Sequence, residues 1–118
     1  MNLAELFHHE TDLRQLSAGT TLFREGDTGD LMYVLLSGSA EISVGGRVVE
    51  TAQAGAIVGE MAMIDDGARS ATVVAKNDCK FVPIDRRRFN FLVQQTPNFA
   101  LHVMRVIANR LRRTDAIL

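Results

Sequence analysis

Short apolar runs separated by turn residues fill the chain from about residue 20 to residue 85. They read as β-strands, because β-branched and aromatic residues dominate them and glycine, asparagine or aspartate lies between them. The predicted strands are 20–23, 31–38, 39–44, 47–53, 70–76 and 79–84. Short strands with tight turns and no long helix among them indicate an antiparallel sandwich or barrel.

The segment 39–53 shows this pattern most clearly. Apolar and polar residues alternate along 40–44, which puts the apolar ones on one face of a strand. Gly45 and Gly46 follow, and glycine tolerates the positive φ angles of a two-residue hairpin turn. We therefore expect 47–53 to return as the partner strand.

The pattern changes to helical after Ile84. Asp85 is an N-cap candidate for a short helix over 86–95, and a second helix is predicted to run from behind Pro97 towards the C-terminus. Its apolar seam recurs at alternating spacings of four and three, through Ala100, Met104, Ile107, Leu111, Thr114 and Leu118. A second stripe lies beside the seam, at Phe99, Val103 and Val106. Two adjacent stripes suit a helix that packs on its own barrel and on a partner molecule.

No linker, repeat or low-complexity segment divides the 118 residues, so we expect a single domain over 1–118. The sheet is expected over about 18–85 and the C-terminal helices over about 86–115. One or two short helical turns are predicted near the N-terminus, around 3–7 and 11–16.

The net charge of −1 conceals an asymmetry, because 13 of the 14 acidic residues precede residue 86 and 7 of the 13 basic residues follow residue 85. A basic tail can bind nucleic acid. At helical spacing it is more often the solvated face of an amphipathic helix, and we expect Arg86, Arg87 and Arg88 to face solvent.

Other composition features limit the classes of protein. The single cysteine, Cys79, excludes an internal disulfide and any multi-cysteine metal centre. No apolar run approaches the roughly 18 residues of a membrane span, and the start lacks the layout of a secretory signal. We expect a cytoplasmic protein that does not enter a membrane.

Two acidic or histidine-containing motifs suggest a metal site. They are His8-His9-Glu10 and Asp65-Asp66, and both are more typical of exposed turns or helix ends. No histidine lies between residues 10 and 101, so the predicted strands lack the ligands of a jelly-roll metalloenzyme. With no catalytic constellation in view, we expect neither an enzyme nor a cofactor.

The stretch "GEMAMIDDGARSATV", residues 59–73, carries the most informative chemistry. Glu60 and Arg69 lie among small and apolar residues, and they could form a structural ion pair. Alternatively, Arg69 could hold a phosphate bidentately while Glu60 accepts from a sugar hydroxyl. A short helical turn over 61–64 would then present free N–H groups to the anion. The residues alone leave both readings open.

This stretch closely resembles the phosphate-binding cassette of cyclic nucleotide-binding domains, with its Gly, Glu, small residue, Arg, Ser and Ala in order. The segment "LFREGDTGDLMYVLLSGSAEI" resembles the opening of the family's β-roll, and "FVPIDRRRF" resembles its last strand and hinge helix. The likeness covers roughly residues 17–115.

The resemblance implies an eight-stranded, antiparallel, jelly-roll-like β-roll (a double-stranded β-helix) with a C-terminal hinge helix and a long helix. It also implies the roles of the site residues. Arg69 would hold the cyclic phosphate and Glu60 the ribose 2′-hydroxyl, with Gly59 allowing close approach. The backbone amides of Met61, Ala62, Ser70 and Ala71 would complete the cradle. Thr114 falls where family regulators carry a base-contacting threonine, whereas Asp115 replaces the serine that follows it.

By this resemblance, the chain is expected to be a stand-alone cyclic nucleotide sensor, with cAMP as the first expectation. It would signal by rearranging its C-terminal helices against a partner protein or a second copy. The chain stops before a helix-turn-helix, which argues against sequence-specific DNA binding. The alternative is a ligand-free dimerisation scaffold that keeps the cassette. The base, the affinity and the downstream partner stay open.

Overall fold

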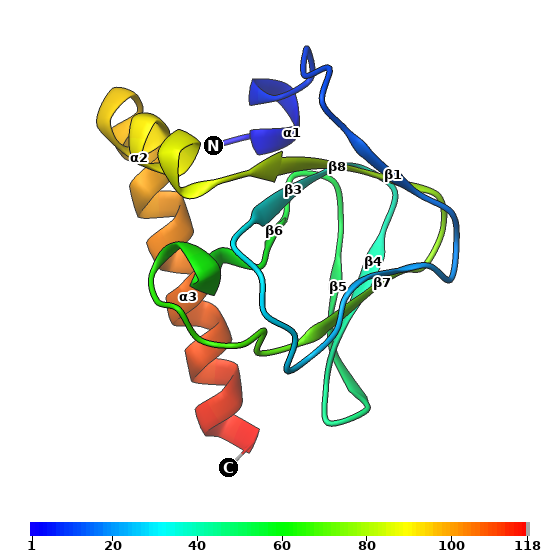
Figure 1. Ribbon diagram of the computed structural model, residues 1–118. Helices are drawn as coiled ribbons and strands as arrows, with labels where there is room; N and C mark the ends of the chain where they lie inside the picture. Colours follow the sequence, from blue (N-terminus) through cyan, green and yellow to red (C-terminus); the bar gives the residue numbers. More distant parts are fainter. Residues whose placement is uncertain (118) are drawn as a thin grey trace.

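The strands form two four-stranded sheets in which every neighbouring pair is antiparallel. The computed structural model describes the backbone of residues 1–117 and the side chains of residues 1–113. One sheet has the order β1 (Arg14–Leu16), β8 (Cys79–Ile84), β3 (Met32–Ser37), β6 (Ile57–Val58). The other has the order β2 (Thr21–Phe23), β7 (Thr72–Ala75), β4 (Ala40–Val44), β5 (Arg47–Ala52). The predicted antiparallel β-roll with eight strands is confirmed (Figure 1).

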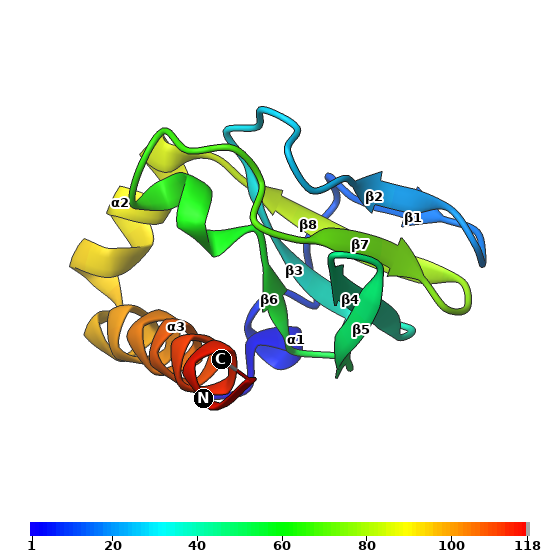
Figure 2. The same ribbon diagram turned by 90° about the horizontal axis from the view of Figure 1, so that it is seen from below.

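Strand β3 is buried on both faces, which explains its unbroken apolar sequence. Met32 and Val34 join a cluster that also contains residues of the helices. Tyr33 and Leu35 point the other way, into a second cluster between the two sheets. The sheet containing β3 is therefore the middle layer, with the helices on one side and the second sheet on the other (Figure 2).

Four helices complete the fold of the described residues. They are α1 (Leu3–Leu6), the 3₁₀ helix η1 (Glu60–Met63), α2 (Arg86–Gln95) and α3 (Pro97–Ile117). The predicted N-cap of α2 is confirmed, since the Asp85 carboxylate accepts a hydrogen bond from the backbone N–H of Arg88 at 2.8 Å. The rings of Phe89 and Phe99 meet edge to face with centroids 5.8 Å apart, and this contact joins α2 to α3.

Two short strands differ from the sequence-based expectation. The helical turn predicted around 11–16 is wrong, because Arg14–Leu16 forms β1 and pairs with β8. Strand β6, which pairs with β3, was not singled out from its residues either. Both strands have three or fewer residues and depend on partners distant in sequence, so they carry no periodic signal of their own.

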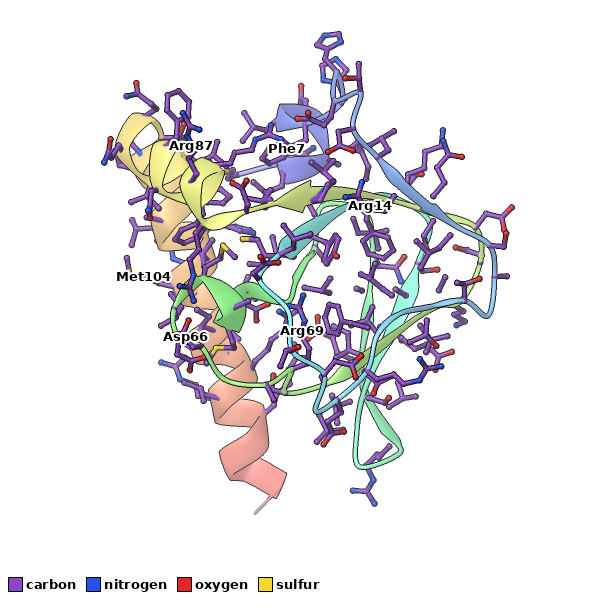
Figure 3. All side chains as sticks on the ribbon, in the orientation of Figure 1. Phe7, Arg14, Asp66, Arg69, Arg87 and Met104 are labelled. Carbon is purple, nitrogen blue, oxygen red and sulfur yellow. The ribbon has the colours of Figure 1, made fainter. Side chains whose placement is uncertain are left out.

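Helix α3 uses its two apolar stripes differently. Phe99 and Val103 are fully buried against the core, whereas Met104 and Leu111 expose 58% and 56% of their surface. Figure 3 places Met104 on the side of α3 that faces away from the β-roll. Among the described residues, no helix is long and apolar enough to cross a membrane.

The contrast between two phenylalanines tests this packing. Phe99→Ala should lower the free energy of unfolding by about 3–5 kcal/mol, because it removes a fully buried ring and leaves a cavity. Phe91→Ala on α2 is the matched control, since 60% of Phe91 is exposed, and should change stability by less than about 1 kcal/mol. Urea unfolding followed by circular dichroism measures both, and equal losses would contradict the assigned packing.

Candidate functional site

The sequence 59–71 crosses the mouth of the β-roll between β6 and β7, and its first residue needs to be glycine. Gly59 has φ +74°, in the left-handed region that glycine adopts without strain. A Cβ atom at this position would lie 2.6 Å from Nη1 of Arg69. Gly59 therefore sets the start of η1 and leaves space for the arginine.

Arg69 is buried, with only 9% of its surface exposed. Its guanidinium carbon lies 4.2 Å from the centroid of the Phe23 ring, within cation–π range. Nη1 donates a long hydrogen bond of 3.4 Å to the Gly59 carbonyl, and the buried Nε has no hydrogen-bond partner among the described residues. Burying a cation this way is costly unless an anion joins it.

The loop between β2 and β3 holds Arg69 in place through the backbone. The Arg69 N–H donates to the Asp27 carbonyl at 2.8 Å, and the Gly26 N–H donates to the Arg69 carbonyl at 2.9 Å. Gly29 in the same loop lies against the guanidinium, because a Cβ there would come 2.4 Å from Nη2. These backbone contacts and the space left by Gly29 therefore set the position of Arg69.

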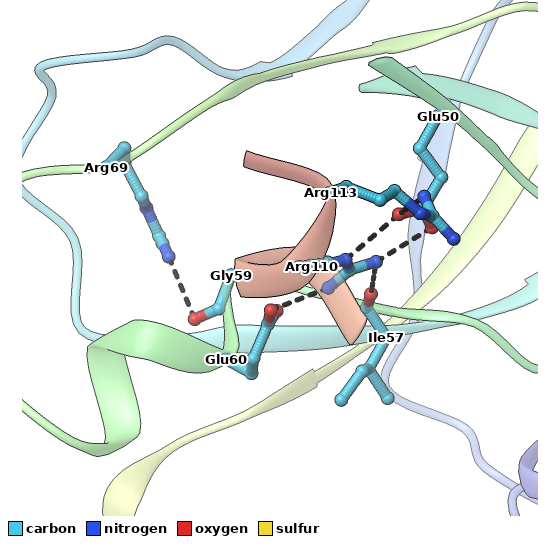
Figure 4. A network of polar contacts seen from close by, with 7 residues as sticks. All are labelled: Glu50, Ile57, Gly59, Glu60, Arg69, Arg110 and Arg113. Carbon is cyan, nitrogen blue, oxygen red and sulfur yellow. Dashed lines mark hydrogen bonds and ion pairs between the residues drawn. The ribbon is translucent and has the colours of Figure 1, made fainter. Parts of the chain in front are cut away.

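Glu60 does not pair with Arg69, which answers the question left open by the residues. Its buried carboxylate accepts from Nη1 of Arg110 at 2.6 Å instead (Figure 4). Arg110 also donates to both carboxylate oxygens of Glu50 at 3.1 Å and to the Ile57 carbonyl at 2.8 Å. Arg113 adds a contact of 2.9 Å to Glu50. This Glu50–Glu60–Arg110–Arg113 network ties α3 to β5 and η1.

The network shifts the pKa values of two of its members. Burial works against the charged form of Glu50, but the hydrogen bonds and charges of Arg110 and Arg113 outweigh it and lower its pKa. Burial likewise disfavours the Arg110 cation, yet its bonds to Glu50 and the charge of Glu60 raise its pKa. Both groups are therefore charged at neutral pH.

Two connected spaces open beside these charges. A small cavity of about 60 Å³ lies between Arg69, Glu60 and the wall of the β-roll. It shares lining residues with a groove of about 710 Å³ between the β4–β5 hairpin and α3, a size typical of small-molecule sites. The groove walls are mostly apolar, from residues such as Ile42, Val49 and Ile107, and its rim carries the charges of Glu50 and Arg113.

The structure brings most of the predicted site residues together. The small cavity is lined by Gly59, Glu60, Met61, Ala62, Arg69, Ser70 and Ala71. The Ala62 amide, one of the expected phosphate donors, donates to the Gly59 carbonyl at 3.2 Å. The predicted base contact, Thr114, belongs to α3, but its side chain lies outside the described residues.

Three residues of the site were missed from the sequence. They are Phe23, which lies under Arg69, and the network members Glu50 and Arg110. Arg110 was assigned to a solvated basic face, and that expectation is wrong for it, because 23% of its side chain is exposed and it holds two carboxylates. A basic residue flanked by apolar Ile107 and Leu111 on a helix was the available signal.

The described residues contain no group of three His, Cys, Asp or Glu side chains that could hold a metal ion. Asp65 and Asp66 are exposed, as expected of a solvated turn.

The sequence profile named cyclic nucleotide-binding domain matches residues 13–96, which include the whole cavity-forming turn. The chain belongs to the cyclic nucleotide-binding domain family. Its β-roll is therefore the fold of this family.

Relatives of this cyclic nucleotide-binding domain occur in larger proteins of different kinds. The cyclic AMP receptor protein of Thermus thermophilus is 30% identical over 98% of the chain and 61% of that protein. The crystal structure of the Thermus thermophilus catabolite activator protein superposes with a TM-score of 0.79 at 29% identity, covering 95% of this chain and 55% of that one. Lysophospholipase NTE1 of Chaetomium globosum is 32% identical over 83% of the chain, which spans only 7% of that protein. The chain thus spans less than two thirds of each of these relatives.

The lowered pKa of Glu50 predicts how the network responds to acid. Its ordinary pKa is 4.5 and the folded-state pKa is lower, so its stabilising contribution is complete above about pH 4.5 and is lost as the pH falls through the folded-state value. Glu50→Gln should cost about 1–3 kcal/mol at pH 7. That cost should shrink as the pH falls from 4.5 towards the folded-state value, because Glu50 takes up a proton first in the unfolded chain and then, at lower pH, in the folded protein.

Urea unfolding between pH 7 and pH 3 measures this dependence. Glu41→Gln is the control, since it makes the same charge change on β4 and its carboxylate enters no ion pair among the described side chains. A Glu50→Gln cost that stayed constant down to pH 3 would contradict the role of the ionised carboxylate.

Proposed function

We propose that this chain is a non-enzymatic sensor that binds a cyclic nucleotide, with cAMP as the first candidate. The observation that carries the proposal is the buried Arg69 guanidinium, which lines a cavity and whose Nε has no hydrogen-bond partner in the part of the chain that the structure describes. The family membership supports the ligand class, and the name of the Thermus thermophilus relative supports cAMP.

The charges of the site favour a monoanion. Glu50 and Glu60 offset Arg110 and Arg113, which leaves Arg69 as the uncompensated charge of this group. A cyclic phosphodiester carries a single negative charge and presents two oxygens to the planar guanidinium fork. A free phosphate monoester or a nucleoside triphosphate would bring additional negative charge close to Glu60.

The rest of a nucleotide fits the remaining space. A carboxylate has about four acceptor positions, so Glu60 can accept from a ribose hydroxyl while Arg110 stays bound to it. The base would extend into the groove, whose apolar lining includes Ile42, Val49 and Ile107. The expected base contact with Thr114 belongs to the same proposal.

Signalling would pass through α3, because Arg110 already connects this helix to Glu60. A ligand that shifts the Glu60 carboxylate would change the energy of its ion pair with Arg110. That change would alter the preferred position of α3. The readout would be a partner protein or a second copy that recognises α3.

Arg69→Ala should weaken cAMP binding at least about 100-fold, because it removes charge-assisted hydrogen bonds to the phosphate worth about 3 kcal/mol or more. Arg14→Ala on β1 is the control, since Arg14 is exposed, pairs with Asp12 and lies outside the cavity. Isothermal titration calorimetry measures both variants. If the wild-type chain bound neither cAMP nor cGMP at high micromolar concentration, the sensing function would be contradicted. The ligand-free dimerisation scaffold would then be the remaining alternative. An Arg69→Ala variant that bound as tightly as wild type would refute the site.

The exposed side of α3 is the surface proposed for a second copy. Met104→Glu places a charge at the centre of this exposed seam and should shift a wild-type dimer towards monomer in sedimentation velocity. Val48→Glu on β5, also about half exposed, is the control and should leave the dimer unchanged. A wild-type chain that sedimented as a monomer at all concentrations would rule out self-association through α3.

A further inference from the structure

Arg86, the first residue of α2, does not simply face solvent as its sequence suggested. Nε and Nη2 both donate to the Ala62 carbonyl, at 3.2 and 3.0 Å. Nη2 also lies 2.9 Å from the Asp65 carbonyl and 2.6 Å from the Asp66 carboxylate. One guanidinium therefore binds η1 and the turn that follows it.

The two carbonyl contacts matter more than the ion pair. Asp66 is 91% exposed and Arg86 half exposed, so their mutual attraction is screened by water. The Ala62 carbonyl, in contrast, belongs to a buried residue in η1, two positions after Glu60. Arg86 thereby determines the distance between the start of α2 and the helix that carries Glu60.

The neighbouring arginines have different roles. Arg88 forms an ion pair with Glu10 and lies over the Phe7 ring, with 5.2 Å between the guanidinium carbon and the ring centroid. Arg87 is exposed, and Figure 3 shows it on α2 away from Asp66. Among these three consecutive arginines, Arg86 is the one that reaches the residues that line the cavity.

We propose that Arg86 is a positioning residue that couples nucleotide binding at η1 to the position of α2, an inference that rests on the proposed function. Helix η1 is held from two sides, by Arg110 of α3 at Glu60 and by Arg86 of α2 at Ala62. Any shift of η1 on phosphate capture is thus transmitted to both helices. By thermodynamic reciprocity, the free energy with which ligand binding favours the new position of α2 also strengthens ligand binding when α2 occupies that position.

Binding affinity gives the first test. Arg86→Ala should weaken cAMP binding about 5- to 30-fold, within the usual range for coupling between sites, although Arg86 is not among the residues that line the cavity. Arg87→Ala removes the same charge one residue later and should bind within about twofold of wild type. Arg86→Lys should recover part of the affinity, because an ammonium can reach a carbonyl but lacks the planar fork. Equal affinities for Arg86→Ala and wild type would overturn the proposal.

Hydrogen exchange separates positioning from a loss of stability and from a failure of the proposed function. Without ligand, Arg86→Ala should speed exchange of the Ile64 and Asp65 amides, which donate to Met61, while the strands keep wild-type protection. With cAMP, residues 86–95 should gain protection in wild type and Arg87→Ala but not in Arg86→Ala.

Two results would overturn separate claims. If wild type bound no cyclic nucleotide, the proposed function would fail, while the ligand-free exchange would still decide whether Arg86 holds the turn. If nucleotide bound and residues 86–95 gained the same protection from hydrogen exchange in Arg86→Ala as in wild type, only the coupling role of Arg86 would be refuted.

Discussion

The ion pair between Glu60 and Arg110 is the contact on which the arrangement of the site depends. Glu60 is a buried carboxylate, and without a cation nearby its desolvation would be too costly to maintain. Arg110 supplies that cation from α3, and Glu50 holds the same guanidinium in a bidentate grip. The long helix is therefore placed over the groove by charge as well as by the apolar contacts of Phe99 and Val103.

Arg69 illustrates the opposite balance. Its backbone is tied to the β2–β3 loop and its guanidinium lies over Phe23, yet no carboxylate pairs with it among the described side chains. In the proposed function, an anion that binds Arg69 would not have to order this side chain, because the fold already holds it in place. The two arginines therefore have separate roles: Arg110 joins the helix to the sheet, and Arg69 faces the small cavity.

Local sequence signals were enough to predict the elements whose structure depends on residues close together in the chain. The Gly45–Gly46 hairpin and the Asp85 cap follow from short-range backbone rules, and both are present. The strand at 14–16 is not recoverable in this way, because its stability comes from pairing with β8 more than sixty residues later. Arg110 and Arg86 were read as solvated for a similar reason. Their partners are Glu50, Glu60 and the Ala62 carbonyl, which lie 24 to 60 residues away in the sequence.

The distribution of burial explains why the turn after η1 is suited to respond to a ligand. Residues 64–68 are all exposed, so almost no apolar packing holds this segment. Its position is set instead by polar contacts at its two ends, the backbone of Arg69 on one side and Arg86 on the other. Polar contacts of this kind can be exchanged at low net cost, because water or a ligand can replace each partner. The strands cannot rearrange so readily, since moving Phe81 or Val34 would open cavities in a close-packed core. In the proposed function, a phosphate bound to Arg69 would therefore act on the part of the molecule that is least constrained by packing, and the two arginines bound to η1 would pass that change to α2 and α3.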